Sequence, residues 1–241
     1  MNAVNETGYA YSGNPTRNPF RFMLALWRSM KDLTNTEEVA IVEIGFARSR
    51  FGRRLARWNV TLEALGRDPR TAKAIELRAP AQPIDLAALA NLPEGTLGRR
   101  FADHCRAKSL NPNLVHIDGD DAESWLLSHL YSTHDIWHVA TGWGNDEAGE
   151  VGLGAFYMAQ LEAPFFTFLF AIILLNTVFM KPTTYRERLD AMVAGYRLGQ
   201  HAEPLFGLDW SRYWDRPLDE IRAELGLTEA EIVGEGIRSA A

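Results

Sequence analysis

The sequence has little cysteine and little lysine. A single cysteine among 241 residues, Cys105, cannot form a disulfide within the chain, which is typical of a reducing compartment. Its neighbour His104 could form a nucleophilic pair with it. Adjacent residues on a helix point about 100° apart, however, so the pair would have poor geometry. We therefore interpret Cys105 as a semi-buried thiol. The 25 basic residues are almost all arginine, and the net charge of −6 argues against nucleic-acid binding.

Long hydrophobic runs are also missing. No stretch reaches the ~20 consecutive apolar residues that span a bilayer. The longest apolar run extends from Phe165 to Met180 and is interrupted by Thr167, Asn176 and Thr177. It is either a buried core helix, which we favour, or the wall of a lipid site. Residues 1–19 are polar and lack the apolar run of a signal peptide, so we expect a disordered leader there and a tail over 228–241.

Strand signals are nearly absent, because no long stretch alternates between apolar and polar residues. Helical periodicity with short turns predicts an all-α fold of about ten helices in a single domain over residues 20–227. We expect helices over 20–31, 36–48, 50–65, a short segment from 69, 85–91, 93–110, 120 or 121 to 141, 146–161, 164–180, 185–201 and 217–226.

Two histidines and two acidic residues are spaced in a way that suits a metal ion. His134 and His138 are four residues apart, so on a helix they share a face, and Asp135 falls within the same arc of about 100°. Glu150 lies about one turn after a glycine-rich break at 142–145, as His138 lies about one turn before it. In a helical hairpin, two imidazoles and one or two carboxylates would meet. The pattern therefore predicts a metal site on a hairpin.

A structural interpretation competes with the metal, since a buried histidine is usually a hydrogen-bonded core residue. Burying four such polar groups without a metal or another partner is costly, so the spacing favours the metal. Tyr157 and Gln160 are candidate pocket walls and equally good core-edge residues. The other histidines are interpreted as structural or surface residues: His104, His116, His129 and His201. An arginine cluster is interpreted as a solvated helix face rather than a lipid or phosphate contact: Arg48, Arg50, Arg53, Arg54 and Arg57.

Four segments occur together in this sequence. One is His134-Asp135-x-x-His138, followed after eleven residues by Glu150. The others are Leu-Pro-Glu-Gly-Thr-Leu-Gly at 92–98, the glycine-rich segment at 149–160, and Arg-Pro-Leu-Asp-Glu-Ile-Arg at 216–222 with Leu-Gly at 225–226. In this combination, over roughly residues 20–227, the chain resembles the coenzyme Q (ubiquinone) biosynthesis protein 4 family.

The resemblance implies an all-helical fold and a divalent metal, zinc, bound by His134, Asp135, His138 and Glu150. It implies a hydrophobic cleft for a polyprenyl tail, which the apolar run would line. It also implies oxidative decarboxylation, with hydroxylation at ring carbon C1, of a prenylated 4-hydroxybenzoate. Asp135 would be a ligand or the catalytic base. Two histidines and one carboxylate are also the ligand set of non-heme iron(II) oxygenases, so iron(II) is the alternative ion.

The expected partners are the prenylated aromatic substrate, other ubiquinone biosynthetic enzymes and, peripherally, a membrane. An exposed apolar cleft would also suit a homodimer. One rival interpretation is a non-catalytic, prenyl-lipid-binding scaffold with a structural metal. Another is a hydrolase with a His-Asp dyad or a zinc protease, which the sequence disfavours. Because nothing resembles a mitochondrial transit peptide, we expect a bacterial protein at the cytoplasmic face of the inner membrane.

Overall fold

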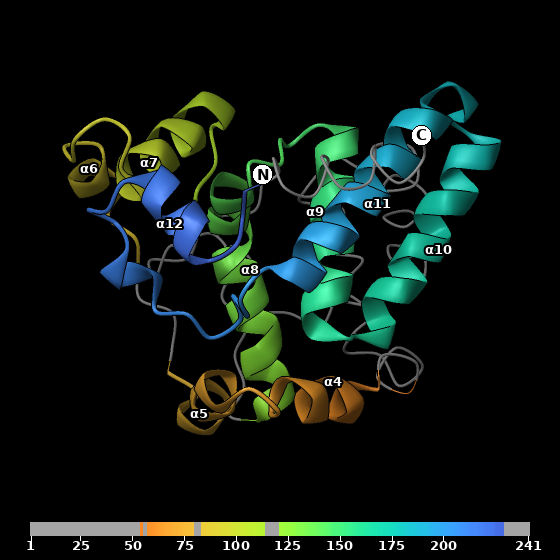
Figure 1. Ribbon diagram of the computed structural model, residues 1–241, viewed down its shortest axis with the longest axis horizontal. Coiled ribbons are helices and arrows are strands. Elements are labelled where there is room, and N and C mark those ends of the chain that lie inside the picture. Colours follow the sequence, from red (N-terminus) through yellow and green to blue (C-terminus); the bar gives the residue numbers. More distant parts are fainter. Residues whose placement is uncertain (1–53, 55–56, 80–82, 114–120, 229–241) are drawn as a thin grey trace, which may run out of the picture. The chain divides into compact units, whose positions relative to one another are not determined.

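The computed structural model describes residues 54, 57–79, 83–113 and 121–228 (Figure 1). These ranges are built from helices and contain no strand, only an isolated antiparallel bridge between Thr96 and Pro217. The predicted all-α domain is therefore confirmed. The predicted leader, the helices expected at 20–31 and 36–48, and the tail beyond residue 228 lie outside the described residues. Of the arginine cluster only Arg54 and Arg57 are described, and both are exposed.

The described helices belong to two compact units. One unit contains residues 66–142 and 202–228, and the other contains 57–65 and 143–201. The first unit has α5 (Pro69–Leu77), α6 (Leu86–Leu89), α7 (Leu97–Lys108), α8 (Ala122–Thr141), the 3-10 turn η3 (Trp210–Arg212) and α12 (Leu218–Glu224). The second has α4 (Trp58–Leu65), α9 (Glu147–Leu161), α10 (Pro164–Phe179), the 3-10 turn η2 (Pro182–Thr184) and α11 (Tyr185–His201).

In the first unit, acidic N-caps start most helices where the sequence predicted them. Asp68, Asp85 and Asp121 each accept a hydrogen bond from a backbone N–H in the first turn of α5, α6 and α8. Helix α7 begins four residues later than predicted. Residues 93–96 instead form a turn that Gly95 allows with φ +84°, and Thr96 is the N-cap.

The segment before α12 packs on the start of α7. The amide of Gly98 donates to the carbonyl of Trp214 (2.9 Å), and the amide of Leu97 donates to Arg216 (3.0 Å). A side chain at position 98 would press against that Trp214 carbonyl, so glycine is required there. The indole of Trp214 lies 5.4 Å from the Phe101 ring. These contacts fix α12 within the unit that also contains α8.

In the second unit, α9 and α11 lie side by side (Figure 1). Their backbones approach closely because two glycines of α11 face α9. A Cβ at Gly195 would overlap the carbonyl oxygen of Gly152, and one at Gly199 would lie 2.7 Å from that of Phe156. A small apolar cluster formed by Val151, Ala155, Phe170 and Ala191 is buried beside this contact.

Helix α10 differs from the core helix that its composition favoured. Phe165 and Phe170 are buried, but five apolar residues toward its C-terminal end are exposed: Leu174, Leu175, Val178, Phe179 and Met180. Among the described helices none is by itself long and apolar enough to cross a membrane. Helix α10 and the following segment, Pro182–His201, meet the criteria of length and composition only as a pair bent by 113°.

Candidate metal centre

Helix α8 carries the histidine pair, and both of its ends are capped. Asp121 accepts a hydrogen bond from the amide of Ser124 (2.7 Å) at the N-terminus. At the C-terminus, Gly142 has φ +86° and its amide donates to the carbonyl of His138 (2.9 Å). The helix has the bounds predicted from the sequence, so His134 and His138 lie on successive turns of one helical face.

The Nε2 atoms of the two imidazoles face each other. These atoms are 3.2 Å apart, and the rings are perpendicular with centroids 4.7 Å apart. His138 is 1% exposed, and His134 is partly buried. Two imidazole nitrogens bound to one tetrahedral zinc ion at ~2.0–2.1 Å stand about 3.3 Å apart. The observed spacing is therefore suited to a shared metal ion.

Glu150 lies in the first turn of α9. The helix is capped by Asp146, whose carboxylate accepts from the amide of Gly149 (2.8 Å) and whose carbonyl accepts from that of Glu150 (2.9 Å). The backbone of Gly144 packs directly on Gly149, where a Cβ would overlap it. Glu150 thus has a well-defined backbone position. Within the first unit the His134–His138 pair is compatible with a divalent metal ion, and the role of Glu150 as a third ligand stays a prediction.

The charge of Asp135 acts on α7, which belongs to the same unit as α8. Burial, followed by the negative charge of Asp135, raises the pKa of Cys105 to about 12. Cys105 is a free thiol and only 1% exposed. The thiol is therefore protonated at neutral pH, as expected for a structural cysteine. The roles of Asp135 as ligand or base stay predictions.

His104 is a neighbour of the site that the sequence analysis missed. It lies on α7, and its ring stacks against that of His138 with a centroid distance of 6.2 Å and an interplanar angle of 22°. This contact depends on how α7 packs against α8. No local spacing links a residue on α7 to the motif on α8, so sequence reasoning could not find it.

The remaining described histidines are consistent with the structural or surface interpretation. The His129 ring contacts those of Trp125 and Phe206, and its Nε2 accepts from the amide of Gly207 (3.1 Å). Burial lowers its pKa to about 4, so it is neutral at pH 7. His201 is exposed in the last turn of α11. His116 lies outside the described residues.

Tyr157 and Gln160 have contacts that favour their interpretation as core-edge residues over pocket walls. The Tyr157 ring is 3% exposed and stacks on Phe166 with a centroid distance of 5.3 Å and an interplanar angle of 7°. The side-chain amide of Gln160 donates to the carbonyl of Gly199 (2.8 Å) and so links α9 to α11. Both side chains therefore stabilise the helical packing around α9.

Comparison with known proteins identifies relatives of this chain. The sequence profile of the family described as "Coenzyme Q (ubiquinone) biosynthesis protein Coq4" matches residues 52–231. One relative, "Ubiquinone biosynthesis protein coq4, mitochondrial" of Aspergillus flavus, is 26% identical over 156 residues, which are 62% of this chain and 53% of the relative. The COQ4 homologue of Bos taurus is 23% identical over 188 residues, or 74% of this chain and 68% of the relative. The chain spans about half the length of the fungal relative.

A solved structure supports the same relationship. A crystal structure from Nostoc punctiforme PCC 73102, provisionally named a ubiquinone biosynthesis protein, superimposes with a TM-score of 0.72 at 28% identity. The match covers 88% of this chain and 99% of that one.

These names correct one expectation. We predicted a bacterial protein at the cytoplasmic face of the inner membrane, but curated relatives from Aspergillus flavus, Bos taurus and Rattus norvegicus are named as mitochondrial proteins. The inference from the polar start of the sequence was wrong, because composition near a terminus is a weak indicator of compartment. The profile match covers well over half of the chain, and by that match the chain belongs to the coenzyme Q (ubiquinone) biosynthesis protein Coq4 family.

Proposed function

We propose that this Coq4-family protein of ubiquinone biosynthesis is a metal-dependent oxidative decarboxylase. Its substrate would be a prenylated 4-hydroxybenzoate-type ring, on which the carboxyl group at C1 is replaced by a hydroxyl. The observation that carries the proposal is the pair of imidazole nitrogens 3.2 Å apart on α8, one of them on the buried His138. This spacing is close to that of two imidazole nitrogens on one tetrahedral zinc ion, so both nitrogens could bind the same metal.

The proposed ligands are His134, His138 and Glu150, with Asp135 as a fourth ligand or as the base. Three protein ligands would leave positions open for a substrate oxygen. The bound ion would act as a Lewis acid on the carboxylate or phenolate of the substrate. Zinc is the proposed ion, and iron(II) is the alternative because two histidines and one carboxylate suit non-heme iron.

The net reaction requires an oxidant, and we propose dioxygen together with a two-electron donor. The ring carboxylic acid, dioxygen, two protons and two electrons give the ring hydroxyl, carbon dioxide and water. In this scheme the carboxylate of Asp135 would take the proton of the ring hydroxyl.

The exposed apolar end of α10 supports the lipid part of the proposal. Leu175, Val178 and Phe179 are 53%, 58% and 75% exposed, and such a patch on a protein surface usually binds something. We propose that it contacts the prenyl tail or the membrane that contains it. We also propose that this apolar surface of α10 could bind other ubiquinone biosynthetic enzymes or a second copy of the chain in a homodimer. Replacing these three residues with serine should weaken binding of a prenyl lipid in vesicles, and unchanged binding would contradict the assignment.

The same observation favours a second candidate function. A non-catalytic scaffold that binds prenylated intermediates would also need the apolar face of α10, and it could use the metal as a structural element. The two candidates differ in turnover, since only the enzyme releases carbon dioxide.

A single experiment separates them. The protein would be purified with its bound metal and incubated in air with a short-chain prenyl-4-hydroxybenzoate and a two-electron donor. We expect release of carbon dioxide and a hydroxylated ring, both lost in His134→Ala/His138→Ala. The matched control is His201→Ala, which changes an exposed histidine of α11 and should keep full activity. Metal and lipid binding without turnover would favour the scaffold.

A further inference from the structure

We propose that Arg222 and Arg188 are positioning residues of the metal centre. Each holds the end of one helix that carries a ligand: Arg222 holds the C-terminal end of α8, and Arg188 holds the N-terminal end of α9. The inference rests on the proposed metal site. Arg222 acts through the backbone of α8, and Arg188 acts through the side chain of Glu147.

Arg222 reaches from α12 to the last turn of α8. Its Nε donates to the carbonyl of Ala140 (2.9 Å), and one terminal nitrogen donates to that of Val139 (3.1 Å). The last four carbonyls of a helix have no partner within the helix. Here Val139 and Ala140 obtain theirs from Arg222, while the carbonyl of His138 accepts from Gly142. The positive charge of Arg222 also interacts favourably with the negative, C-terminal end of the helix dipole.

Ala140 and Val139 directly follow the buried ligand His138, so the guanidinium fixes the backbone that carries this imidazole. The guanidinium also packs closely against Gly142, where a Cβ would lie 3.2 Å from it. A lysine could donate to one of the two carbonyls but could not bridge both with the planar geometry of arginine.

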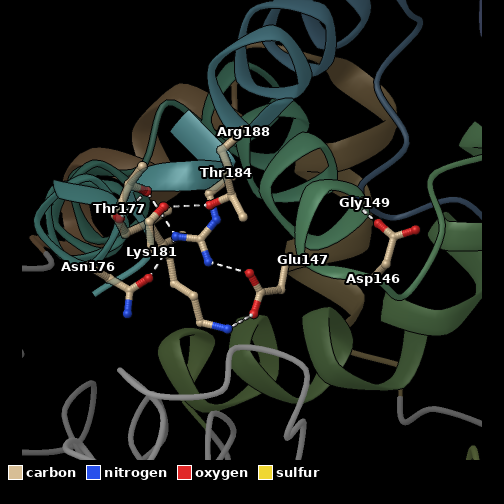
Figure 2. Close-up of polar contacts among 9 residues, drawn as sticks. Asp146, Glu147, Gly149, Asn176, Thr177, Lys181, Thr184 and Arg188 are labelled. Atoms are coloured by element: carbon tan, nitrogen blue, oxygen red, sulfur yellow. Dashed lines mark hydrogen bonds and ion pairs between the residues drawn. The ribbon is translucent and has the colours of Figure 1, made fainter. Parts of the chain in front are cut away.

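Arg188 does the equivalent for α9 from within the second unit (Figure 2). Its side chain is 2% exposed, and one terminal nitrogen donates to Glu147 in the first turn of α9 (2.6 Å). Its other terminal nitrogen donates to Asn176 (2.6 Å) and Thr177 (2.9 Å) near the end of α10. Lys181 adds a second ion pair to Glu147 (2.9 Å).

Glu147 precedes Glu150 by three residues, so both belong to the first turn of α9. Arg188 therefore fixes this turn against the end of α10 and the body of α11. A buried charge with partners in two other helices has a single favourable position, because each lost bond leaves a desolvated group unpaired. This rigidity would give the proposed ligand Glu150 a fixed backbone position within its own unit.

The test is metal affinity, measured on the full-length protein by competition for zinc with a chromophoric chelator. Cobalt(II) replaces zinc in a second measurement, since its visible spectrum reports ligand geometry. The variants are Arg222→Gln and Arg188→Lys. Loss of outer-shell support typically weakens metal binding 10–100-fold, so we expect each variant to bind zinc at least about 10-fold more weakly and to change the cobalt spectrum.

Matched controls change arginines of the same units that do not contact these helix ends. Arg212→Gln alters an 81% exposed side chain in η3, and Arg186→Lys alters an exposed residue of α11. Leu89→Ala, which removes a buried side chain of α6, serves as a control for general loss of stability. All three should keep the zinc affinity and the cobalt spectrum of the unaltered protein.

The outcomes are distinct. If the unaltered protein binds neither ion, the proposed metal site fails. If it binds zinc and both arginine variants bind it equally well, the metal site stands and the positioning roles are overturned. The positioning roles would also be overturned if Leu89→Ala lost as much zinc affinity as the arginine variants while all of them unfolded at the same temperature. The weaker binding would then result from lower stability.

Discussion

The Nε2 atoms of His134 and His138 lie 3.2 Å apart on successive turns of α8. Without a metal, the contact is a hydrogen bond only when one of the two Nε2 atoms carries a proton and the other does not. With a metal, both nitrogens offer a lone pair to the same ion. This relationship is the part of the site that belongs to a single helix, and it is the basis of the proposed chemistry.

Because α9 and α11 pack closely, we expect a single added methyl group at Gly195 to lower the stability of the protein strongly. In Gly195→Ala the new Cβ would overlap the carbonyl oxygen of Gly152, which is backbone and cannot turn away. We expect the free energy of unfolding to fall by about 3 kcal/mol or more, at the upper end of overpacking effects. Urea denaturation followed by circular dichroism measures the change.

Gly154→Ala is the matched control in α9. Its Cβ would lie 3.1 Å from the Phe170 ring, a side chain that can shift slightly. Alanine also has the higher helix propensity, so we expect a change of less than about 1 kcal/mol. Equal effects of the two substitutions would contradict the close approach of α9 and α11.

His129 should make the protein sensitive to mild acid. Its pKa is about 4 in the folded protein, against an ordinary value of 6.5. The unfolded chain therefore binds a proton that the folded one excludes, and stability falls as the pH drops from about 6.5 toward 4. The loss from this residue alone is up to about 3 kcal/mol.

In His129→Gln, the side-chain oxygen can still accept the Gly207 amide, but no proton is taken up. Urea denaturation at pH 7, 5.5 and 4 should show a smaller decline of stability than in the unaltered protein. His201→Gln, which changes an exposed histidine, should keep the original decline. If His129→Gln declines as steeply as the unaltered protein, the buried neutral state of His129 is wrong.

Glu147 should add a second pH dependence of stability, in a lower pH range than that of His129. Burial alone would raise its pKa, but hydrogen bonds from Lys181 and Arg188 and their positive charges lower it overall. Its contribution is therefore present at neutral pH and is lost as the pH falls through the folded pKa, below the ordinary value of 4.5. Glu147→Gln should lower the free energy of unfolding at pH 7 by about 1–3 kcal/mol, because Arg188 loses its counter-charge.

The difference between Glu147→Gln and the unaltered protein should shrink toward pH 3, where Glu147 itself is protonated. Glu187→Gln, an exposed acidic residue in the first turn of α11, is the matched control and should change stability by less than about 0.5 kcal/mol. A difference for Glu147→Gln that stays constant from pH 7 to pH 3 would show that charge is not its cause.

Local features of this fold could be read from the sequence. Asp121 before α8 and Gly142 after it fix the helix ends by bonds within one or two turns, so the position of the histidine pair followed from the chain alone. The late start of α7 was missed because Gly95 and Thr96 form a turn that sequence periodicity does not reveal.

Contacts between distant segments could not be predicted. Asn176 and Thr177 interrupt an apolar run, and only the structure explains them as partners of the buried Arg188. The bonds from Arg222 to α8 and the stacking of His104 on His138 likewise depend on tertiary packing. The exposed end of α10 escaped prediction because a helix that is apolar on all sides shows no preferred face.

The central claim is best tested by X-ray absorption spectroscopy at the metal edge of the full-length protein as purified, with metal content measured on the same sample. The account predicts about one divalent ion per chain, with imidazole scattering from two histidines and additional oxygen ligands. Both the ion and the imidazole signal should be lost in His134→Ala/His138→Ala and kept in His201→Ala. A protein without bound metal, or with metal that shows no imidazole scattering, would contradict it.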